Sequence, residues 1–282
     1  MTKNPHKTWF ITGTSSGFGR AFAEHALARG YNVVATARNI SKLESLVAMA
    51  PERVAAIALD VDKLGDAPAA ISSAIARFGK IDVLINNAGY GVVGALEETS
   101  NDEMRAIMDT NFFGAIAVTQ AALPIFRAQG FGAIVNISSM GGQLSLGGFS
   151  AYSASKFALE GASEALAQEL APFGVKVLIV EPGAFRTEFA GQAMRQLPII
   201  DAYQDVVGGT RSFAQGMHKS QEGDPRKAAV AIESALEAAN TPLRLALGAD
   251  AVDAIRGHAE GLLRDLAAWE TTSRNTSIGA DV

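Results

Sequence analysis

A glycine-rich turn between two regular segments is the feature that most restricts the fold of this chain. Residues 7–12 are short, apolar and β-prone, as in a buried parallel strand. Glycines at positions 13, 17 and 19 follow at once, then an alanine-rich helical pattern over 20–29 and a second strand over 31–37. Strand, turn, helix and strand within about 30 residues have the size of one βαβ unit. This order predicts a parallel sheet.

The same alternation continues along the chain. Further strands are predicted over 54–59, 81–85, 133–137, 175–180 and 243–247, and helices over 41–50, 62–79, 100–129, 150–173, 224–240 and 251–269. Pro124 lies inside the long helix 100–129, so a kink or break is expected there. Six or seven strands alternating with helices predict an α/β fold, a Rossmann-type, doubly wound and mostly parallel sheet in a single domain over residues 1–282.

Two segments depart from this pattern. Residues 184–223 mix apolar side chains with glycine and polar residues, and a loop of this length is usually functional, so we expect a substrate-binding loop or lid. Its aromatic and methionine side chains, among them Phe185, Phe189 and Met217, either line an apolar pocket or pack on the sheet, and the pattern does not separate the two. The polar tail 270–282 is expected to be loose.

Composition excludes several classes of function. A net charge of −5 without a long basic run argues against nucleic acid as a partner. The chain has no cysteine, which excludes disulfides and thiolate metal sites, and its four histidines are scattered, so we expect no metal. No apolar run reaches the roughly 18 residues of a membrane span, and no signal-peptide core precedes the first strand. We therefore expect a cytoplasmic protein that does not enter a membrane.

The glycines of the turn have separate physical roles. The first permits the tight turn, the second lets the backbone approach a pyrophosphate, and the third lets helix pack on strand. The helix that follows offers free N–H groups and the positive end of its dipole to phosphate. The spacing is Gly-x-x-x-Gly-x-Gly and not the standard Gly-x-Gly-x-x-Gly, and an ordinary glycine turn is the alternative. The strands on both sides favour dinucleotide binding.

The end of the second strand indicates which dinucleotide is bound. NAD sites usually place an acid there for the ribose hydroxyl, whereas an arginine accommodates the 2′-phosphate of NADP. Residues 33–39 contain no acid and one arginine, Arg38, which can pair with a phosphate. The sequence therefore favours NADP(H) over NAD(H), with a solvated arginine at a strand end as the alternative.

Three side chains that can act on a carbonyl converge around the predicted helix 150–173. Tyr152 and Lys156 are four residues apart and share one helix face, and Ser139 comes from the end of the preceding strand. A tyrosine has a reference pKa of about 10, and a neighbouring cation stabilises the phenolate and lowers that pKa. Alone, the pair could equally be a half-buried tyrosine beside an exposed lysine. Ser138 is the rival of Ser139 as the serine that holds the substrate oxygen.

Other candidate residues also fall at the carboxyl ends of predicted strands, where ligands of doubly wound sheets bind. They are the glycine turn, Arg38, Asp60, residues 86–89, Ser139 and residues 182–183. So many candidates at one edge of the sheet argue for a common site.

The chain closely resembles the short-chain dehydrogenase/reductase family at these positions. The matching motifs run in family order over about residues 7–190: Thr12-Gly13-x-x-x-Gly17-x-Gly19, Asp60, Asn86-Asn87-Ala88-Gly89, Asn111, Ser139, Tyr152-x-x-x-Lys156 and Pro182-Gly183-x-x-x-Thr187. Members that prefer NADP often carry a basic residue just before the second glycine. Ser16 stands there, so Arg38 carries the NADP argument.

The resemblance implies catalytic and cofactor-binding roles. Tyr152 would be the general acid or base, Lys156 would lower its pKa and hold the nicotinamide ribose, Ser139 would bind the substrate oxygen, and Asn111 would support a proton relay through Lys156. The cofactor-binding set would also include Gly13, Ser15, Ser16, Phe18, Arg38, Asp60, Val61, Asn87, Ala88, Gly89, Pro182, Gly183, Phe185 and Thr187.

The resulting hypothesis is an NADP(H)-dependent oxidoreductase that interconverts an apolar ketone and a secondary alcohol. A non-catalytic NAD(P)-binding sensor on the same fold is the alternative, although a sensor needs neither Tyr152 nor Lys156. An epimerase or dehydratase of the extended relatives would carry a different glycine spacing and a larger C-terminal domain. The resemblance also implies a homodimer or homotetramer, with helix 150–173 as the expected interface.

Overall fold

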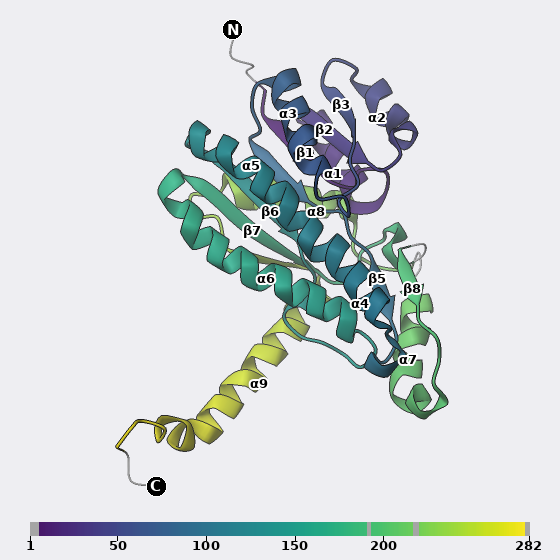
Figure 1. Cartoon of the computed structure of the whole chain (residues 1–282), viewed down its shortest axis with the longest axis vertical. Helices are drawn as coiled ribbons and strands as arrows, with labels where there is room; N and C mark the ends of the chain where they lie inside the picture. Colours follow the sequence, from purple (N-terminus) through teal and green to yellow (C-terminus); the bar gives the residue numbers. More distant parts are fainter. Residues whose placement is uncertain (1–5, 191–192, 217–219, 280–282) are drawn as a thin grey trace.

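A seven-stranded parallel sheet forms the centre of the computed structural model, which describes residues 6–190, 193–216 and 220–279 (Figure 1). The strands lie in the order β3-β2-β1-β4-β6-β7-β9. Their bounds are β1 (Thr8–Ile11), β2 (Asn32–Ala37), β3 (Val54–Ala58), β4 (Val83–Asn86), β6 (Gly132–Ile137), β7 (Val175–Pro182) and β9 (Arg244–Leu247). The order reverses at β1, and the crevice between the ends of β1 and β4 is the topological switch point. The predicted α/β fold class is confirmed.

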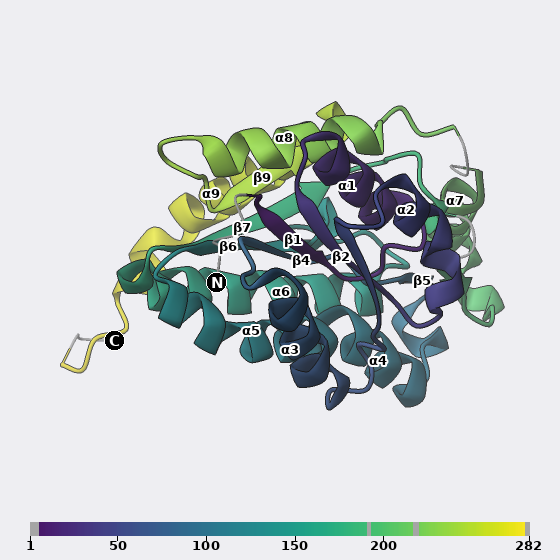
Figure 2. The same cartoon turned by 90° about the horizontal axis from the view of Figure 1, so that it is seen from above.

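Helices cover both faces of the sheet (Figure 2). One layer contains α1 (Gly17–Ala28), α2 (Glu44–Met49) and α8 (Pro225–Glu237), and the other contains α3 (Asp66–Phe78), α4 (Asn101–Met108), α5 (Ala115–Gln129) and α6 (Ser150–Leu170). Alternate residues of β1 supply the two cores, because strand side chains point to opposite faces. Trp9 and Ile11 pack with α1 and α8, and Phe10 packs with α3 and α5.

The predicted helix 100–129 is interrupted, but not at its proline. A π-helical segment over Asp109–Gly114 separates α4 from α5, whereas Pro124 lies inside an unbroken α5. The expected break at Pro124 is therefore wrong, and the alternative of a kink there stays a prediction. Ala122 and Phe126 on either side of the proline are fully buried, and this packing holds the helix together. π-Helical turns often occur at functional sites, and this one carries Asn111.

Residues 184–223 contain more regular structure than the sequence pattern indicates. β8 (Met194–Gln196) pairs in parallel with β5 (Gly91–Val93), and α7 (Gln204–Gly216) follows. We call these three elements, together with the short helix Leu96–Glu98, the small layer. Each strand has three residues, too few for a visible alternation, and its partner is about 100 positions away. Met217 lies outside the described residues.

The chain ends in a long helix, α9 (Ala249–Arg274), which points away from the sheet (Figure 1). The expectation of a loose tail from residue 270 is wrong for 270–274, which continue the helix. Ala267 and Ala268 favour helix, and an ion pair joins Glu270 to Arg274 one turn on. None of the helices in the described part of the chain is long and apolar enough to cross a membrane.

Candidate active site

The glycine turn needs its three glycines for different reasons. Gly13 and Gly17 have φ values of 70° and 56°, in the left-handed region that other residues rarely adopt. A Cβ atom on Gly19 would lie 2.3 Å from the carbonyl oxygen of Gly13 and 2.6 Å from the Asn87 side chain. Only glycine at position 19 lets the start of α1 approach the end of β1, so the unusual spacing forms a close helix–strand contact.

The amino end of α1 has the open donors that a phosphate group requires. The helix begins after Ser16, whose side chain makes no capping hydrogen bond. Ser16 is exposed and Ser15 half-buried at this end. The first N–H groups of a helix have no intrahelical acceptor, and the dipole adds partial positive charge there. The Phe18 ring packs on Phe22 and Phe185, at centroid distances of 5.4 and 5.1 Å.

Asn87 joins the glycine turn to the end of β4. Its side-chain amide donates to the carbonyl oxygens of Thr12 and Gly13, at 2.9 and 3.1 Å. The Thr12 hydroxyl in turn accepts the N–H groups of Asn87 and Ala88, at 2.8 and 3.0 Å. These bonds hold both walls of the switch-point crevice together. Asn87 thus shapes the crevice, and Thr12 is a supporting residue that sequence reasoning named only as part of a motif.

The rim of the crevice carries residues suited to the adenosine half of a dinucleotide. Oδ1 of Asp60 is buried and has no hydrogen-bond partner within the described residues, so an acceptor is available beside the end of β3. Val61 packs against Gly114, where a Cβ atom would lie 2.8 Å from it. Arg38 is exposed at the end of β2 and forms no ion pair with any side chain in the described ranges. The orphaned acceptor, the open helix end and the free arginine fit a dinucleotide.

The loop after β7 closes over the glycine turn from the other side. A Cβ atom on Gly17 would lie 3.4 Å from Thr187, which places these two residues in contact range. A Cβ atom on Gly183 would lie 2.2 Å from the carboxylate of Asp250, so Gly183 packs directly on that side chain. The same carboxylate accepts the N–H of Ala184 at 2.7 Å. Asp250 belongs to the first turn of α9. No local pattern connects it to residues 182–187, so the sequence did not reveal it.

The three proposed catalytic side chains converge. Tyr152 and Lys156 are buried on α6, and the Lys156 ammonium lies 5.9 Å from the centre of the tyrosine ring. Ser139 lies two residues after the end of β6, and its side chain interacts with the Tyr152 phenol. Ser138 is buried behind it beside Glu160. The structure therefore brings Ser139, and not Ser138, to the tyrosine.

Burial dominates the pKa values of Tyr152 and Lys156. Burial raises the pKa of Tyr152 to about 12, and the hydrogen bond with Ser139 offsets only part of that rise. Burial also lowers the pKa of Lys156 to about 8, which the carboxylate of Glu160 partly counteracts. In the protein alone, desolvation of the phenolate dominates the pKa of Tyr152, and the lowering of that pKa by Lys156 stays a prediction. Lys156 instead donates to the carbonyl of Ile137 at 2.8 Å.

Asn111 connects three elements around the tyrosine and lysine. Its side-chain oxygen accepts the N–H of Tyr90 at 3.0 Å, and its nitrogen donates to the Tyr90 carbonyl at 2.9 Å and to Ser155 at 3.0 Å. A Cβ atom on Gly89 would lie 3.0 Å from the Asn111 oxygen and 3.7 Å from the Lys156 nitrogen. Asn111 is therefore near Lys156, and it holds the segment after β4 against α6.

An apolar wall surrounds the Tyr152 ring. Phe149 and Phe189 lie 6.1 and 5.7 Å from it between ring centres. The same cluster contains the buried residues Val92, Ile107, Ala151 and Leu197, of which Val92 belongs to the small layer. Phe189 comes from segment 184–223, so that segment contributes to the surroundings of the proposed acid.

A buried charged cluster behind the site was not predicted. Glu160, one turn after Lys156, and Glu181, at the end of β7, are 3% and 2% exposed. Arg244 contacts both carboxylates, at 3.0 and 3.5 Å. Burial and the nearby Glu160 raise the pKa of Glu181 to about 7. The only sequence signal was the four-residue spacing from Lys156 to Glu160.

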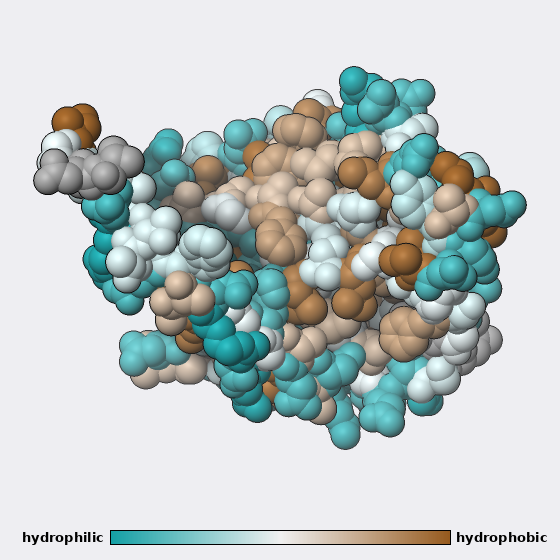
Figure 3. Space-filling view, turned by 90° about the horizontal axis from the view of Figure 1, so that it is seen from below, coloured by the Kyte–Doolittle hydropathy of each residue, from teal (hydrophilic) through white to brown (hydrophobic). Residues whose placement is uncertain are grey.

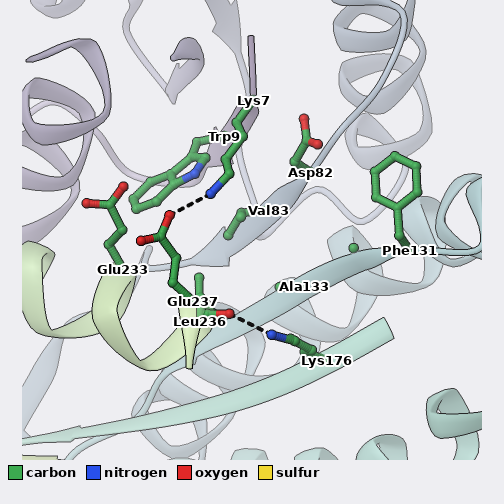
Figure 4. Close-up of a pocket in the computed structure, with 11 residues that line it drawn as sticks. Lys7, Trp9, Asp82, Val83, Phe131, Ala133, Lys176, Glu233, Leu236 and Glu237 are labelled. Atoms are coloured by element: carbon green, nitrogen blue, oxygen red, sulfur yellow. Dashed lines mark hydrogen bonds and ion pairs between the residues drawn. The ribbon is translucent and has the colours of Figure 1, made fainter. Parts of the chain in front are cut away.

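A separate cavity of about 170 Å³ lies at the opposite edge of the sheet (Figure 4). Its lining residues include Lys7, Val83, Ala133 and Lys176, which stand at the amino ends of strands. Lys7 pairs with Glu237 at 2.8 Å, and Lys176 donates to a backbone carbonyl. None of the predicted site residues lines this cavity, so it is distinct from the candidate active site.

The fold and the site together define a class of protein. A phosphate-binding turn at the switch point, with a serine, a tyrosine and a lysine beside it, belongs to a dinucleotide-binding oxidoreductase. The short chain dehydrogenase family matches residues 7–197. The chain belongs to this family and is a dehydrogenase or reductase that acts on CH–OH groups.

Similar proteins agree with this assignment. The chain is 41% identical over 271 residues to Oxidoreductase BOA17 of Botryotinia fuckeliana, covering 95% of this chain and 98% of that protein. It is 38% identical over 251 residues to 3-ketodihydrosphingosine reductase of Bacteroides thetaiotaomicron, covering 84% and 86%.

Solved structures extend the comparison to the whole fold. A short-chain dehydrogenase from Streptomyces avermitilis has a TM-score of 0.93 and 51% identity, covering 98% of this chain and 100% of that one. Because the uncovered 2% is shorter than α9, the match includes most of that helix. A family member from Burkholderia phymatum in complex with NAD has a TM-score of 0.81 and 25% identity, covering 94% and 97%. A nicotinamide cofactor is therefore part of this enzyme's chemistry.

Proposed function

We propose that this enzyme interconverts an apolar ketone and a secondary alcohol with NADP(H), with Tyr152 as the general acid or base. The convergence of Ser139, Tyr152 and Lys156 at the edge of the sheet that carries the glycine turn is the observation that supports it most. When bound, the cofactor would supply or accept the hydride. The glycine turn, the open end of α1, Asp60 and the loop after β7 would hold it.

The protein's own residues would handle the substrate oxygen and the proton. The Ser139 hydroxyl would hold the carbonyl oxygen beside the phenol. With a pKa of about 12, Tyr152 is protonated at neutral pH and is ready to donate a proton during reduction. Lys156, with a pKa of about 8, is mostly charged at neutral pH and would stabilise the phenolate left behind. Asn111 would support resupply of that proton through Lys156.

Removal of the phenol hydroxyl tests the chemistry. Tyr152→Phe is expected to lower kcat by about 10²–10⁴-fold, the usual contribution of a general acid or base, while NADPH affinity stays nearly unchanged. Tyr203→Phe is a matched control, because among the described residues its hydroxyl bonds only to Glu97 at the surface. Unchanged turnover in Tyr152→Phe would reject the mechanism. If the enzyme binds cofactor but turns over none of a varied set of ketones and alcohols, the sensor alternative is favoured.

The cofactor preference depends on Arg38. This side chain is exposed and has no carboxylate partner among the described residues, so it is free to pair with a 2′-phosphate. Arg38→Ala is expected to raise the KM for NADPH at least about tenfold and to change that for NADH little. Arg127→Ala, an exposed arginine on α5, is the control. Equal effects on both cofactors would show that Arg38 does not recognise the phosphate.

An apolar substrate is supported by the surroundings of the phenol. Phe149, Phe189 and Leu197 are in the cluster around Tyr152 and present apolar atoms where a substrate chain would lie. The Bacteroides relative is named 3-ketodihydrosphingosine reductase, and this name describes reduction of a keto compound. A series of 2-ketones of increasing chain length is expected to show kcat/KM rising with length. A constant or falling kcat/KM would contradict an apolar binding wall.

A further inference from the structure

Helix α9 leaves its own protein body after about two turns. Ala251 is fully buried and Asp250 holds the loop after β7, so the first turn is anchored. From Arg256 to Arg274 every residue is exposed except Gly261, which is half-buried. At 1.5 Å per residue these 19 positions extend about 28 Å. The projecting part, residues 256–274, makes its ion pairs within the helix, as with Glu270 and Arg274.

The projecting part does not have the composition of a helix that is stable in water alone. Gly257 and Gly261 lie within it, and each costs about 1 kcal/mol relative to alanine in a helix interior. Leu262, Leu266 and Trp269 are 57%, 66% and 65% exposed. Helices in proteins obtain most of their stability from packing of an apolar face. This helix therefore needs a partner that its own chain does not provide.

The apolar residues of α9 are spaced for another helix. Alternating steps of three and four residues connect Val252, Ile255, Ala259, Leu262, Leu266 and Trp269, and we call these six the seam. This is the a/d pattern of a heptad repeat, with a period of 3.5 residues, and it is typical of helices that pack side by side with knobs in holes. A flat surface such as a membrane favours a wider apolar stripe.

Polar and charged side chains beside the seam favour one partner and one direction. In an antiparallel pair that sets Ala259 opposite Leu262 of a second copy, all six seam positions meet apolar residues. The same alignment brings His258 next to Asp265 of the second copy, twice by symmetry. A parallel pair would instead bring Asp265 next to Glu270 of the other helix, which is repulsive. The chain thus carries both halves of a self-complementary antiparallel interface.

We propose that α9 is a dimerisation arm that packs antiparallel against α9 of a second copy of this chain through the seam. The end of the molecule from which α9 departs also carries a broad group of apolar residues (Figure 3). The arrangement is independent of the cofactor and of the substrate.

Oligomeric state tests the proposal directly. Sedimentation equilibrium of the full chain at micromolar concentration is expected to show a dimer. Leu262→Glu with Leu266→Glu is expected to raise the dimer dissociation constant at least about 100-fold, because each leucine loses its apolar contact and gains a charge. The matched control is Ala267→Glu with Ala268→Glu, which adds the same charge on the opposite face of the helix. A monomeric wild-type protein would overturn the proposal. So would a leucine variant that stays dimeric, which is the result expected if α6 forms the interface.

Direction can be read with single cysteines, because the chain contains none. Ala259→Cys lies near the proposed two-fold axis and is expected to form a disulfide-linked dimer under oxidation. Ser273→Cys continues the seam by four residues, but antiparallel pairing separates it from its own copy by about 37 Å along the helix. It is therefore expected to stay uncross-linked. Efficient cross-linking at 273, or none at 259, would overturn the antiparallel arrangement. Circular dichroism of every variant checks that the fold is retained.

Discussion

Removal of the Glu98 carboxylate is expected to destabilise the small layer, which contributes Val92 to the cluster around Tyr152. Glu98 and Arg211 form an ion pair whose side chains are only 1% and 7% exposed. The carboxylate also accepts the N–H groups of Ala95 and Ile200. The guanidinium donates to the carbonyl oxygens of Val93, Leu197 and Pro198. One buried pair thus connects β5, the segment after β8 and α7.

The expected magnitude follows from what Glu98→Ala leaves behind. A buried guanidinium would lose its counter-charge, and two backbone N–H groups would lose their acceptor. Breaking a buried ion pair at one partner costs about 3–5 kcal/mol. For a chain of this size, 1 kcal/mol corresponds to about 2–4 °C in Tm, so a fall of about 6–20 °C is expected if the layer unfolds with the rest. If the small layer opens without the rest of the protein, the free energy of that local opening falls by the same amount, and hydrogen exchange in α7 becomes correspondingly faster.

Glu97→Ala is the matched control, because Glu97 lies in the same short helix but is exposed. Its bond to the Tyr203 hydroxyl is at the surface, where a loss below about 1 kcal/mol is expected. The double variant Glu98→Ala with Arg211→Met should regain part of the loss, since no charge remains buried. Equal Tm and equal exchange in Glu98→Ala and Glu97→Ala would refute the reasoning. Val92 of β5 is part of the cluster around Tyr152. Glu98→Ala should therefore raise the KM for the substrate more than the KM for the cofactor.

Two further outcomes are expected. Gly19→Ala should weaken NADPH binding at least about tenfold, because the new Cβ would lie 2.3 Å from the Gly13 carbonyl oxygen and displace the turn. Affinity is measured by fluorescence titration, with Gly209→Ala as the control because the space around Gly209 is open. Equal affinities of the two variants would contradict the steric argument. The second concerns pH. The pKa of Glu181 in the folded protein is raised from its ordinary 4.5 to about 7, so the folded protein holds this proton more tightly than the unfolded chain does. The resulting contribution to folding stability is fully present below about pH 4.5 and is lost as the pH rises through about 7. The free energy of unfolding, measured with urea, should decline by at most about 1.4 kcal/mol per pH unit between about pH 5 and 7. The decline should be smaller in Glu181→Gln. The same slope in both proteins would exclude this carboxyl as the cause.

Local patterns predicted much of the frame and of the site. Every strand of the main sheet lies within two residues of its predicted position, because buried parallel strands are short continuous apolar runs between turns. The glycine turn and the candidates at strand ends were also predictable, since parallel strands place their carboxyl ends at one edge. The four-residue spacing of Tyr152 and Lys156 put them on one helix face before any contact was known.

Longer-range features did not show in the sequence. Asn111 reaches Tyr90 and Ser155 because of a π-helical segment that no propensity marks. The pairing of β5 with β8 joins two three-residue strands far apart in the chain. Arg211 finds its carboxylate more than 100 positions away. Each of these depends on which segments the sheet brings together.

The sequence by itself determined the class of fold, the place of the glycine turn and the residues that we propose for the chemistry, since these follow from short-range periodicity and from residue types at set spacings. The tertiary structure set the pKa values of two of those residues. Burial, which no local pattern encodes, raises the pKa of Tyr152 and lowers that of Lys156. It also selected Ser139 over Ser138, because packing of β6 against α6 turns one hydroxyl to the phenol and the other toward Glu160.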